Sequence, residues 1–347
     1  MGVEDMDINR RQAPRLQVGL PVYNGQNYLA EALDSLLCQT FSDFEIIVSD
    51  NGSTDSTPEI GERFAAADAR VTFHRYDENR GAAWNFNHVF ELSTSPYFKW
   101  AAHDDLHDPT YIERCLDVLE SEPDVGLCYT RSRYIDGDGN AAVGRPSDGC
   151  HLRQASAHDR LHGFFGTFPM HVLFGVVRRE TLESTRLWGS FASADRVLVS
   201  ELALAGQIHE IADPLFVRRF HPDISWFPDM SQKDYAAWYD PRNADKFAIP
   251  VIQRGVEYAK GVHHAPVHGV EAARCYGEVL RYASWDHGVK RVRRYAKAAA
   301  RSAKAKLTPS PAAPAPPASE PTTLEPATSA PSASAPSTPE QSTTALP

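Results

Sequence analysis

The chain has 347 residues, of which 42% are hydrophobic, and its formal net charge at pH 7 is −10. This length and apolar content are sufficient for a large folded core, and the acidity argues against a general nucleic-acid-binding protein. No segment approaches the roughly 18 uninterrupted apolar residues of a membrane span, and the first fifteen residues contain no signal-peptide core. We therefore expect a globular protein of the cytoplasm that binds no nucleic acid.

Short apolar runs alternate with segments of helical periodicity through the first 130 residues. Expected strands are 16–22, 44–49, 71–76, 97–102 and 125–130, and expected helices are 29–37, 57–67, 82–92 and 110–120. This alternation is typical of an α/β fold in which a mostly parallel sheet has helices on both faces and right-handed crossovers. Ligands bind such sheets at the carboxyl ends of the strands.

Two adjacent carboxylates, Asp104 and Asp105, directly follow the expected strand 97–102. Neighbouring acids repel one another, so they lie either in a solvated loop or around a cation. Their place at the ligand-binding edge favours the cation. The first two strands deliver PVYNG (21–25) and SDNGSTD (49–55) to the same edge, although turn formation alone also favours such residues.

The common nucleotide-binding glycine motifs are absent from the sequence. Neither the G-x-G-x-x-G of dinucleotide-binding folds nor the G-x-x-x-x-G-K-[ST] of phosphate-binding loops follows the first strand, which ends in PVYNG. A phosphate ligand would then be neutralised by basic side chains and by a metal held on Asp104 or Asp105.

Several segments within residues 16–226 resemble the inverting glycosyltransferases of family 2, whose nucleotide-sugar-binding domain has the GT-A fold. They are VGLPVYNGQNYLAEALDSLLCQTFSDFEIIVSDNGSTDST, NRGAAWNFN, the acidic stretch, SADRVLVSELALAG and RRFHPDIS. The resemblance implies a nucleoside-diphosphate-sugar donor of the UDP or dTDP type and a hydroxyl acceptor. It also implies a role in cell-surface polysaccharide or glycolipid synthesis.

The resemblance further implies a role for each matching residue. Asp195, at the start of a later helix, matches the base that deprotonates the acceptor hydroxyl. Asp105 and His221 match a site for magnesium or manganese, and Arg218 and Arg219 match the groups that stabilise the leaving diphosphate. The implied nucleotide contacts are Pro21, Tyr23, Asn24, Asp50, Asn51, Arg80 and Asp104, the last toward sugar or ribose.

Two departures from the family pattern leave alternatives open. Ala102 and Ala194 stand where carboxylates are usual, so a nucleotide-sugar-binding module without catalysis is one alternative. A sugar-nucleotide nucleotidyltransferase is another, but it would need a glycine-rich basic loop after the first strand, and PVYNGQNY carries no basic residue. Acceptor contacts are expected from segments 164–174 and 226–239.

The composition predicts how the chain is divided. We expect a flexible N-terminus (1–14), a glycosyltransferase domain (15–226, with a donor-nucleotide half at 15–130 and an acceptor half at 131–226), a helical extension (227–307) and a disordered tail (308–347). Within the extension, residues 290–306 carry eight Lys or Arg and no acid. This basic helix is expected to bring the enzyme to the anionic inner membrane surface, where a lipid-linked acceptor would be found. The five cysteines form no C-x-x-C motif and are expected to be reduced thiols, most of them in the core.

Overall fold

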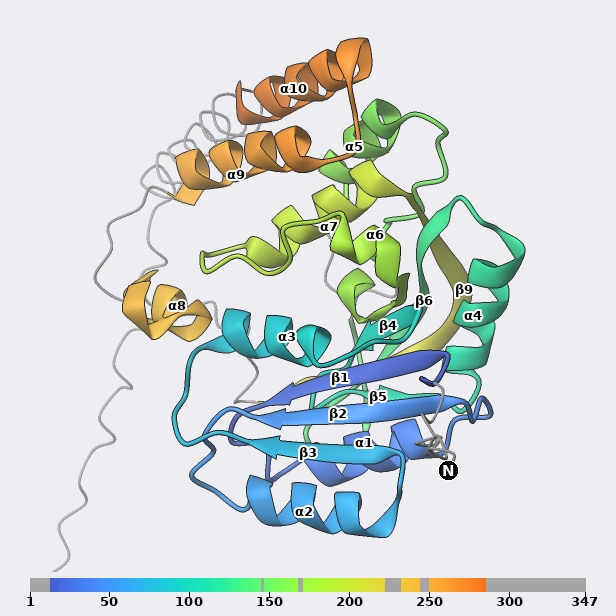
Figure 1. Cartoon of the computed structure of the whole chain (residues 1–347), viewed down its shortest axis with the longest axis vertical. Coiled ribbons are helices and arrows are strands. Elements are labelled where there is room, and N and C mark those ends of the chain that lie inside the picture. Colours follow the sequence, from blue (N-terminus) through green and yellow to red (C-terminus); the bar gives the residue numbers. More distant parts are fainter. Residues whose placement is uncertain (1–12, 145–146, 168–170, 222–231, 244–249, 285–347) are drawn as a thin grey trace, which may run out of the picture. The chain divides into compact units, whose positions relative to one another are not determined.

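A nine-stranded sheet organises the part of the chain that the computed structural model describes, which is residues 13–144, 147–167, 171–221, 232–243 and 250–284 (Figure 1). Its strands are β1 (Leu16–Val22), β2 (Phe44–Asp50), β3 (Val71–Arg75), β4 (Tyr97–Trp100), β5 (Leu106–His107), β6 (Val125–Ile135), β7 (Ala141–Ala142), β8 (Val176–Arg178) and β9 (Gln207–Arg219). The order is β3-β2-β1-β4-β8-β6-β9-β5, with β7 paired to β6. The longest pairings, β1 with β2 and β6 with β9, are parallel, whereas β8 is antiparallel to both of its neighbours.

Helices cover both faces of this sheet, as the sequence predicts. They are α1 (Leu29–Leu37), α2 (Thr57–Ala67), α3 (Ala82–Glu91), α4 (Tyr111–Ser121), α5 (Ala157–Phe165), α6 (Arg179–Glu183), α7 (Ala194–Ala205), α8 (Gln232–Tyr239), α9 (Pro250–His264) and α10 (Gly269–Ser284), with 3-10 turns η1 (Val172–Phe174) and η2 (Pro241–Asn243). One apolar core lies between the sheet and α1 and α4, and a second packs α3, α5, α7, α9 and α10 together. Gly19 in β1 lets α3 approach closely, since a Cβ there would lie 2.6 Å from a Val89 methyl group.

The predicted elements are confirmed with small changes in their ends. The main difference is β8, which comes from residues after η1 and inserts between β4 and β6. The strand has three residues, too few to give a periodic pattern of its own. In the sheet it lies between β4 and β6, and β9 follows on the other side of β6. The basic residues at the end of β9 lie next to the acidic stretch after β4.

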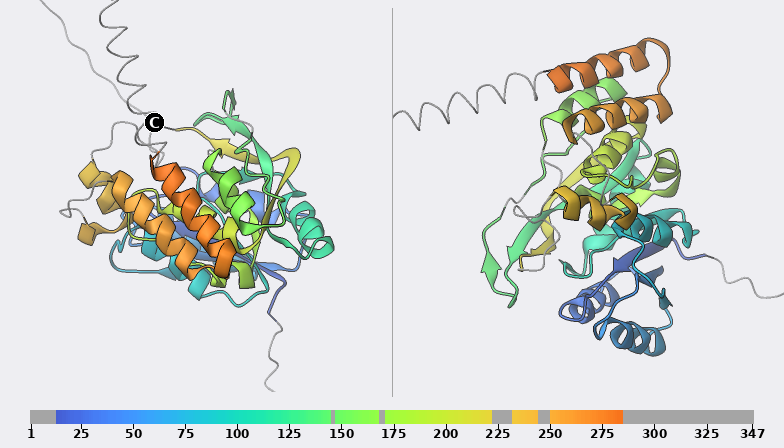
Figure 2. Two further views of the ribbon diagram at one scale, coloured as in Figure 1. Left: turned by 90° about the horizontal axis from the view of Figure 1, so that it is seen from above. Right: turned by 90° about the vertical axis from the view of Figure 1, so that its left-hand side faces the viewer.

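Contacts divide the chain into two compact units, Met1–Tyr295 and Ala296–Pro347, and the second lies outside the described residues. In the first unit α9 packs on α7 and α10 packs on α5, and Figure 2 shows these four helices gathered together. The expected basic helix at 290–306 and the expected tail at 308–347 also lie outside the described residues. Among the described helices, none has the length and apolarity needed to cross a membrane.

The five cysteines are free thiols, and four of them, Cys115, Cys128, Cys150 and Cys275, are buried while Cys38 is exposed. This agrees with the prediction of reduced thiols that mostly fill the core.

Candidate active site

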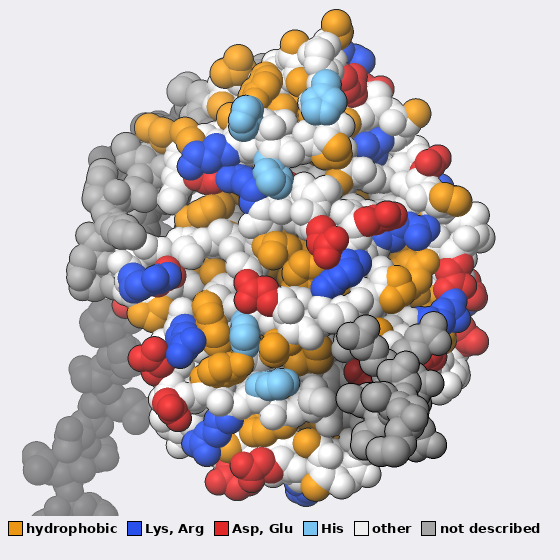
Figure 3. Space-filling model, in the orientation of Figure 1, with side chains coloured by type: hydrophobic (Ala, Val, Ile, Leu, Met, Phe, Trp, Pro, Cys, Tyr) orange, Lys and Arg blue, Asp and Glu red, His pale blue; other side chains and the backbone are white. Residues whose placement is uncertain are grey.

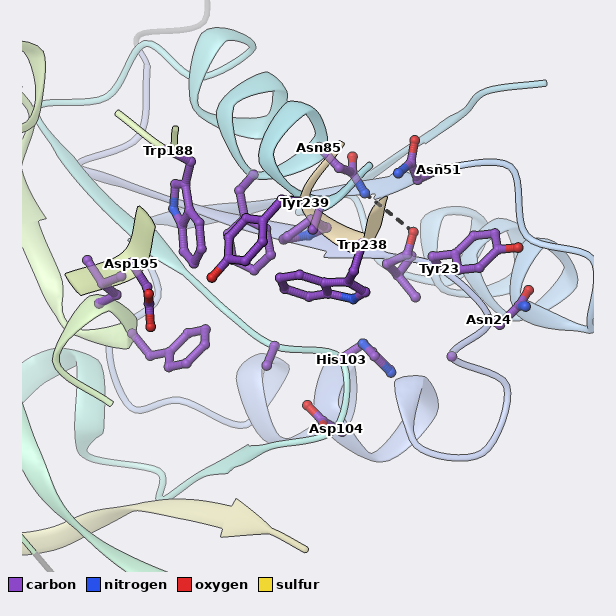
Figure 4. Close-up of a pocket in the computed structure, with 18 of the residues that line it drawn as sticks. Tyr23, Asn24, Asn51, Asn85, His103, Asp104, Trp188, Asp195, Trp238 and Tyr239 are labelled. Atoms are coloured by element: carbon purple, nitrogen blue, oxygen red, sulfur yellow. Dashed lines mark hydrogen bonds between the residues drawn. The ribbon is translucent and has the colours of Figure 1, made fainter. Parts of the chain in front are cut away.

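A cavity of about 920 Å³ opens at the carboxyl ends of β1, β2 and β4 (Figure 4). Tyr23 and Asn24 lie at one end, Asp104 and His103 lie along it, and Asp195 lies at the other end. This is the position that a parallel sheet gives to a ligand. One continuous space therefore joins the expected nucleotide contacts to the expected base.

Backbone strain is concentrated around this cavity. The non-glycine residues of the described chain with positive φ are Asn24 (52°), Leu187 (57°) and Ser193 (68°). Asn24 and Ser193 line the cavity, and Leu187 precedes Trp188, which also lines it. Left-handed backbone at non-glycine residues costs free energy and persists only where the surroundings impose it, which is common at functional sites.

Hydrogen bonds tie together the two loops at the donor end, which follow β1 and β2. The backbone N–H of Asn24 donates to Ser53 Oγ (2.8 Å), and that of Thr54 donates to Asn24 Oδ1 (2.9 Å). The backbone N–H of Gly25 donates to Thr57 Oγ1 (2.7 Å). Tyr23, in contrast, is 43% exposed at the mouth of the cavity, so its ring remains free to stack on a planar ligand.

Pro21, Tyr23, Asn24, Asn51 and Asp104, all predicted nucleotide contacts, line the cavity. Asn51 also holds the next loop, because its side chain donates to Asn79 Oδ1 (3.0 Å) and to the backbone oxygen of Gly81 (3.2 Å).

Asp50 and Arg80, also predicted nucleotide contacts, lie outside the cavity lining. Asp50 is fully buried and its Oδ1 accepts the backbone N–H of Ser53 (3.0 Å), so it stabilises the loop after β2. The Arg80 guanidinium lies over the rings of Trp84 (4.8 Å) and Tyr76 (5.6 Å). In this arrangement both residues support the loops that form the donor end.

The two neighbouring carboxylates after β4 have different surroundings. Asp104 lines the cavity and its Oδ2 is 3.0 Å from His221 Nε2. Asp105 is fully buried, where its Oδ2 accepts Arg218 Nη1 (2.6 Å) and its Oδ1 accepts the backbone N–H of Arg219 (3.1 Å). The prediction gave the cation to Asp105. The structure instead uses Asp105 to join the end of β4 to the end of β9, and it is Asp104 that faces the cavity.

The basic residues at the end of β9 complete this part of the site. Arg218 and His221 line the cavity, whereas Arg219 is buried beside it. Arg219 donates to the backbone oxygen of Asp104 (3.1 Å) and to Glu31 (2.5 Å), and it lies over the ring of Tyr28. Arg219 thus fixes the acidic stretch and does not reach toward a ligand.

Asp104 and His221 form a donor set that fits a divalent cation. A carboxylate oxygen and an imidazole nitrogen suit manganese, and a diphosphate would supply further oxygens. Within the described ranges, no group of three or more His, Cys, Asp or Glu could hold a metal by itself. Burial raises the pKa of Asp104, but the hydrogen bond with His221 and the nearby His103 and Arg218 lower it overall, so this carboxylate stays ionised.

Asp195 lies in the first turn of α7, two residues after the strained Ser193, and lines the far end of the cavity. Its Oδ1 is buried and accepts no hydrogen bond in the structure. Burial raises the pKa of Asp195 above its ordinary value, although hydrogen bonds from the Arg196 N–H and the Tyr239 hydroxyl oppose the change. A buried carboxylate with a vacant lone pair and a raised pKa is suited to accept a proton from a bound hydroxyl.

The raised pKa of Asp195 predicts that kcat falls on the acid side of its pH profile at a higher pH than an ordinary aspartate would give. A base must be ionised to act, so activity should fall as the pH drops through the pKa of Asp195. Because burial raises this pKa, the fall should occur at a pH above the value of about 3.9 that an exposed aspartate shows. The pH dependence of kcat, measured where circular dichroism shows the fold intact, tests this. Constant kcat down to pH 4 would contradict the assignment.

Aromatic side chains surround Asp195, and periodicity did not distinguish them from core residues. Trp188 and Tyr239 line this end of the cavity together with all three residues of η1, and Trp238 lies further along it, toward His103 (Figure 4). Two segments expected to contact the acceptor therefore contribute, although Phe164 itself lies in the core. Gly81 allows the end of α8 to come this close, because it has φ of 89° and a Cβ there would lie 2.5 Å from the Tyr239 backbone oxygen.

This sheet, with its cavity at the strand ends, is the GT-A fold of nucleotide-sugar glycosyltransferases. Residues 1–349 of TarS from S. aureus, solved in complex with UDP, match it with a TM-score of 0.58 over 79% of this chain and 72% of that one. The two sequences are 15% identical, so the likeness concerns the fold alone.

Residues 17–183 match the family described as glycosyl transferase family 2. An uncharacterised glycosyltransferase of Rickettsia typhi is 38% identical over 107 residues, which are 31% of this chain and 32% of that protein. Chondroitin synthase of Escherichia coli is 32% identical over 130 residues, 38% of this chain and 19% of the synthase. Hyaluronan synthase of Pasteurella multocida is 30% identical over 138 residues, 40% of this chain and 14% of the synthase. The matches thus span about a third or less of each of these relatives.

Proposed function

We propose that the chain is a metal-dependent, inverting glycosyltransferase that moves a sugar from a nucleoside diphosphate, of the UDP or dTDP type, to a hydroxyl acceptor. The observation that carries this proposal is the single cavity that contains Tyr23 and Asn24 at one end, Asp104 and His221 along it, and Asp195 at the other end. Nucleotide, diphosphate and acceptor can then occupy one space in the order that a direct displacement requires.

The reaction in this arrangement is a single displacement. The acceptor hydroxyl gives its proton to the free Oδ1 of Asp195 as its oxygen attacks the anomeric carbon of the donor sugar. A new C–O bond forms, and the bond from the anomeric carbon to the diphosphate oxygen breaks on the opposite face. The nucleoside diphosphate leaves with the bonding electron pair, so the anomeric configuration is inverted.

The leaving diphosphate needs positive charge near its oxygens. Arg218 lines the cavity and is held by its ion pair with Asp105, so its guanidinium is already oriented. Asp104 and His221 would hold the divalent cation, which when bound offsets negative charge on the diphosphate. Arg219 supports the same region from behind through the Asp104 backbone.

The two alanines that replace family carboxylates have different consequences here. Ala194 is 1% exposed and packs in the core of α7, outside the cavity lining, so an acid at this position would not face the acceptor. Ala102 does line the cavity, where the absence of a carboxylate leaves Asp104 as the acid toward the diphosphate. These placements favour an active enzyme over a module that binds without catalysis.

The nucleotidyltransferase alternative has less support from the site. Such an enzyme must neutralise a triphosphate at the loop after β1, and the residues from Pro21 to Tyr28 that line the cavity include no Lys or Arg.

On the sequence alone we also propose that residues 290–306 bring the enzyme to an anionic membrane surface. A lipid-linked acceptor would be found there, and the reaction would serve polysaccharide or glycolipid synthesis.

Release of nucleoside diphosphate from a panel of nucleotide sugars, with and without manganese, tests the proposed function. One or more UDP or dTDP sugars should be turned over, by slow hydrolysis when no acceptor is present. Failure of every nucleotide sugar to be hydrolysed, or to raise the melting temperature of the protein, would leave the binding module or the nucleotidyltransferase as the better account.

Removal of divalent cations should abolish this activity. Asp104 and His221 provide two ligands, and the diphosphate would remain weakly bound and uncompensated without the ion. Chelation should reduce nucleotide release to background, and manganese or magnesium should restore it. Full activity in excess chelator, with metal content shown to be negligible by mass spectrometry, would contradict the role given to Asp104.

A further inference from the structure

Two arginines lie at the Asp195 end of the cavity, away from the expected nucleotide contacts. Arg196 follows the proposed base in α7, and Arg254 comes from α9, which packs on α7. The proposed reaction assigns neither of them a task. Their positions place positive charge next to the space where the acceptor would bind.

Arg254 differs from its neighbours in having no counter-charge. It makes no hydrogen bond or ion pair within the described residues, and its Nε is buried without a partner. The nearby Arg186, in contrast, pairs with Glu201 (2.6 Å) and with Glu257 (2.8 Å). Lys260 in the same helix also pairs with Glu257 (2.8 Å). Glu201 and Glu257 are therefore engaged elsewhere, and among the described residues Arg254 has no acid paired with it where it lines the cavity.

Arg196 packs against aromatic side chains at this end of the cavity. Its guanidinium lies 5.5 Å from the ring centroid of Phe164. Burial lowers the pKa of Arg196, but the neighbouring Tyr258, Tyr282 and Asp195 raise it overall, so the guanidinium stays charged. Aromatic contacts of this kind orient a guanidinium. Asp195 is the one carboxylate of the described lining at this end of the cavity.

This local excess of positive charge contrasts with the outer surface. On the face shown in Figure 3, acidic and basic side chains of the described residues are interspersed. A buried guanidinium nitrogen without a partner is costly, and an anionic ligand can accept its hydrogen bond. The planar guanidinium matches carboxylate and phosphate geometry in particular.

We propose that the acceptor carries a phosphate or carboxylate group, which Arg254 and Arg196 bind while Asp195 takes the proton from the acceptor hydroxyl. This inference rests on the proposed glycosyl transfer and names its acceptor class. The anion would also hold the acceptor in a fixed orientation over the aromatic residues around Asp195.

Matched acceptor pairs test this on the full-length protein. Methyl β-glucuronide is compared with methyl β-glucoside, and glycerol 3-phosphate with glycerol, so that the two pairs separate carboxylate from phosphate. The charged member of one pair should show a kcat/KM at least about tenfold higher than its neutral partner, since charge-assisted hydrogen bonds are strong. Arg254→Gln should remove this preference by raising the KM for the charged acceptor, whereas Lys260→Gln, which removes a charge from the same helix outside the cavity, should keep it.

Two controls separate this inference from the proposed function. Donor hydrolysis without acceptor reports on the glycosyltransferase itself, so hydrolysis together with equal use of charged and neutral acceptors would overturn the inference alone. Calorimetric titration of glycerol 3-phosphate and methyl β-glucuronide in saturating UDP covers the case in which none of these small acceptors is glycosylated. If neither anion binds, the inference is wrong. It is also wrong if Arg254→Gln lowers the affinity for UDP as much as the affinity for the acceptor, because Arg254 would then not act on the acceptor specifically.

Discussion

Replacement of Asp195 by asparagine should lower kcat for glycosyl transfer by about 10²–10⁴-fold, the usual contribution of a positioned general base. Asparagine keeps the size of the side chain and can still hydrogen-bond to Tyr239, so the cavity should keep its shape. The affinity for the nucleotide should change little, because Asp195 lies at the opposite end of the cavity from Tyr23 and Asn24. Initial rates of nucleotide release in the presence of acceptor measure the effect.

Asp213→Asn is a suitable control for this variant. Asp213 is half exposed and pairs with Arg114 on the surface, a contact worth at most about 1 kcal/mol. The control should keep the full rate of transfer. If Asp195→Asn also retains it, the proton acceptor must be another group and the proposed role of α7 is wrong.

Asparagine substitutions at the two neighbouring acids should have opposite consequences. Asp105→Asn leaves Arg218 buried without its counter-charge, so the free energy of unfolding should fall by about 3–5 kcal/mol. Asp104→Asn removes a carboxylate at the cavity wall, so the fold should be affected less, while binding of manganese with nucleotide should be lost. The contrast follows from the partners of each carboxylate, since the residues are adjacent in sequence.

Urea unfolding and a manganese-dependent thermal shift separate the two outcomes. Both are measured for each variant in the presence and absence of UDP. If Asp105→Asn keeps its stability but no longer binds manganese, Asp105 is the metal ligand, as predicted from the sequence. A large loss of stability in Asp104→Asn would show that its hydrogen bond with His221 serves mainly the fold.

Local patterns were sufficient for the first half of the sheet. Strands β1 and β2 and helix α1 each have their own periodicity, and alternation of strands and helices fixes a parallel arrangement. The insertion of β8 could not be predicted in this way. Three residues carry no period, and their antiparallel pairing with β4 and β6 depends on the path of the chain far from either strand.

The sequence predicted those residues of the candidate site that directly follow a strand. Asp104 was expected at the sheet edge for this reason, and Asp195 was expected through the resemblance to a family. Which of two adjacent carboxylates faces the cavity depends on where Arg218 lies, more than a hundred residues later. The position of Arg254 likewise depends on how α9 packs against α7, which no local pattern encodes.

The anomeric configuration of the product tests the central claim most directly. A single displacement by a hydroxyl activated at Asp195 must invert the configuration at the anomeric carbon, whichever sugar is transferred. Proton NMR of the glycosidic product, through the coupling constant of its anomeric proton, should show the configuration opposite to that of the donor. A product that retains the donor configuration would contradict direct displacement and, with it, the role given to Asp195.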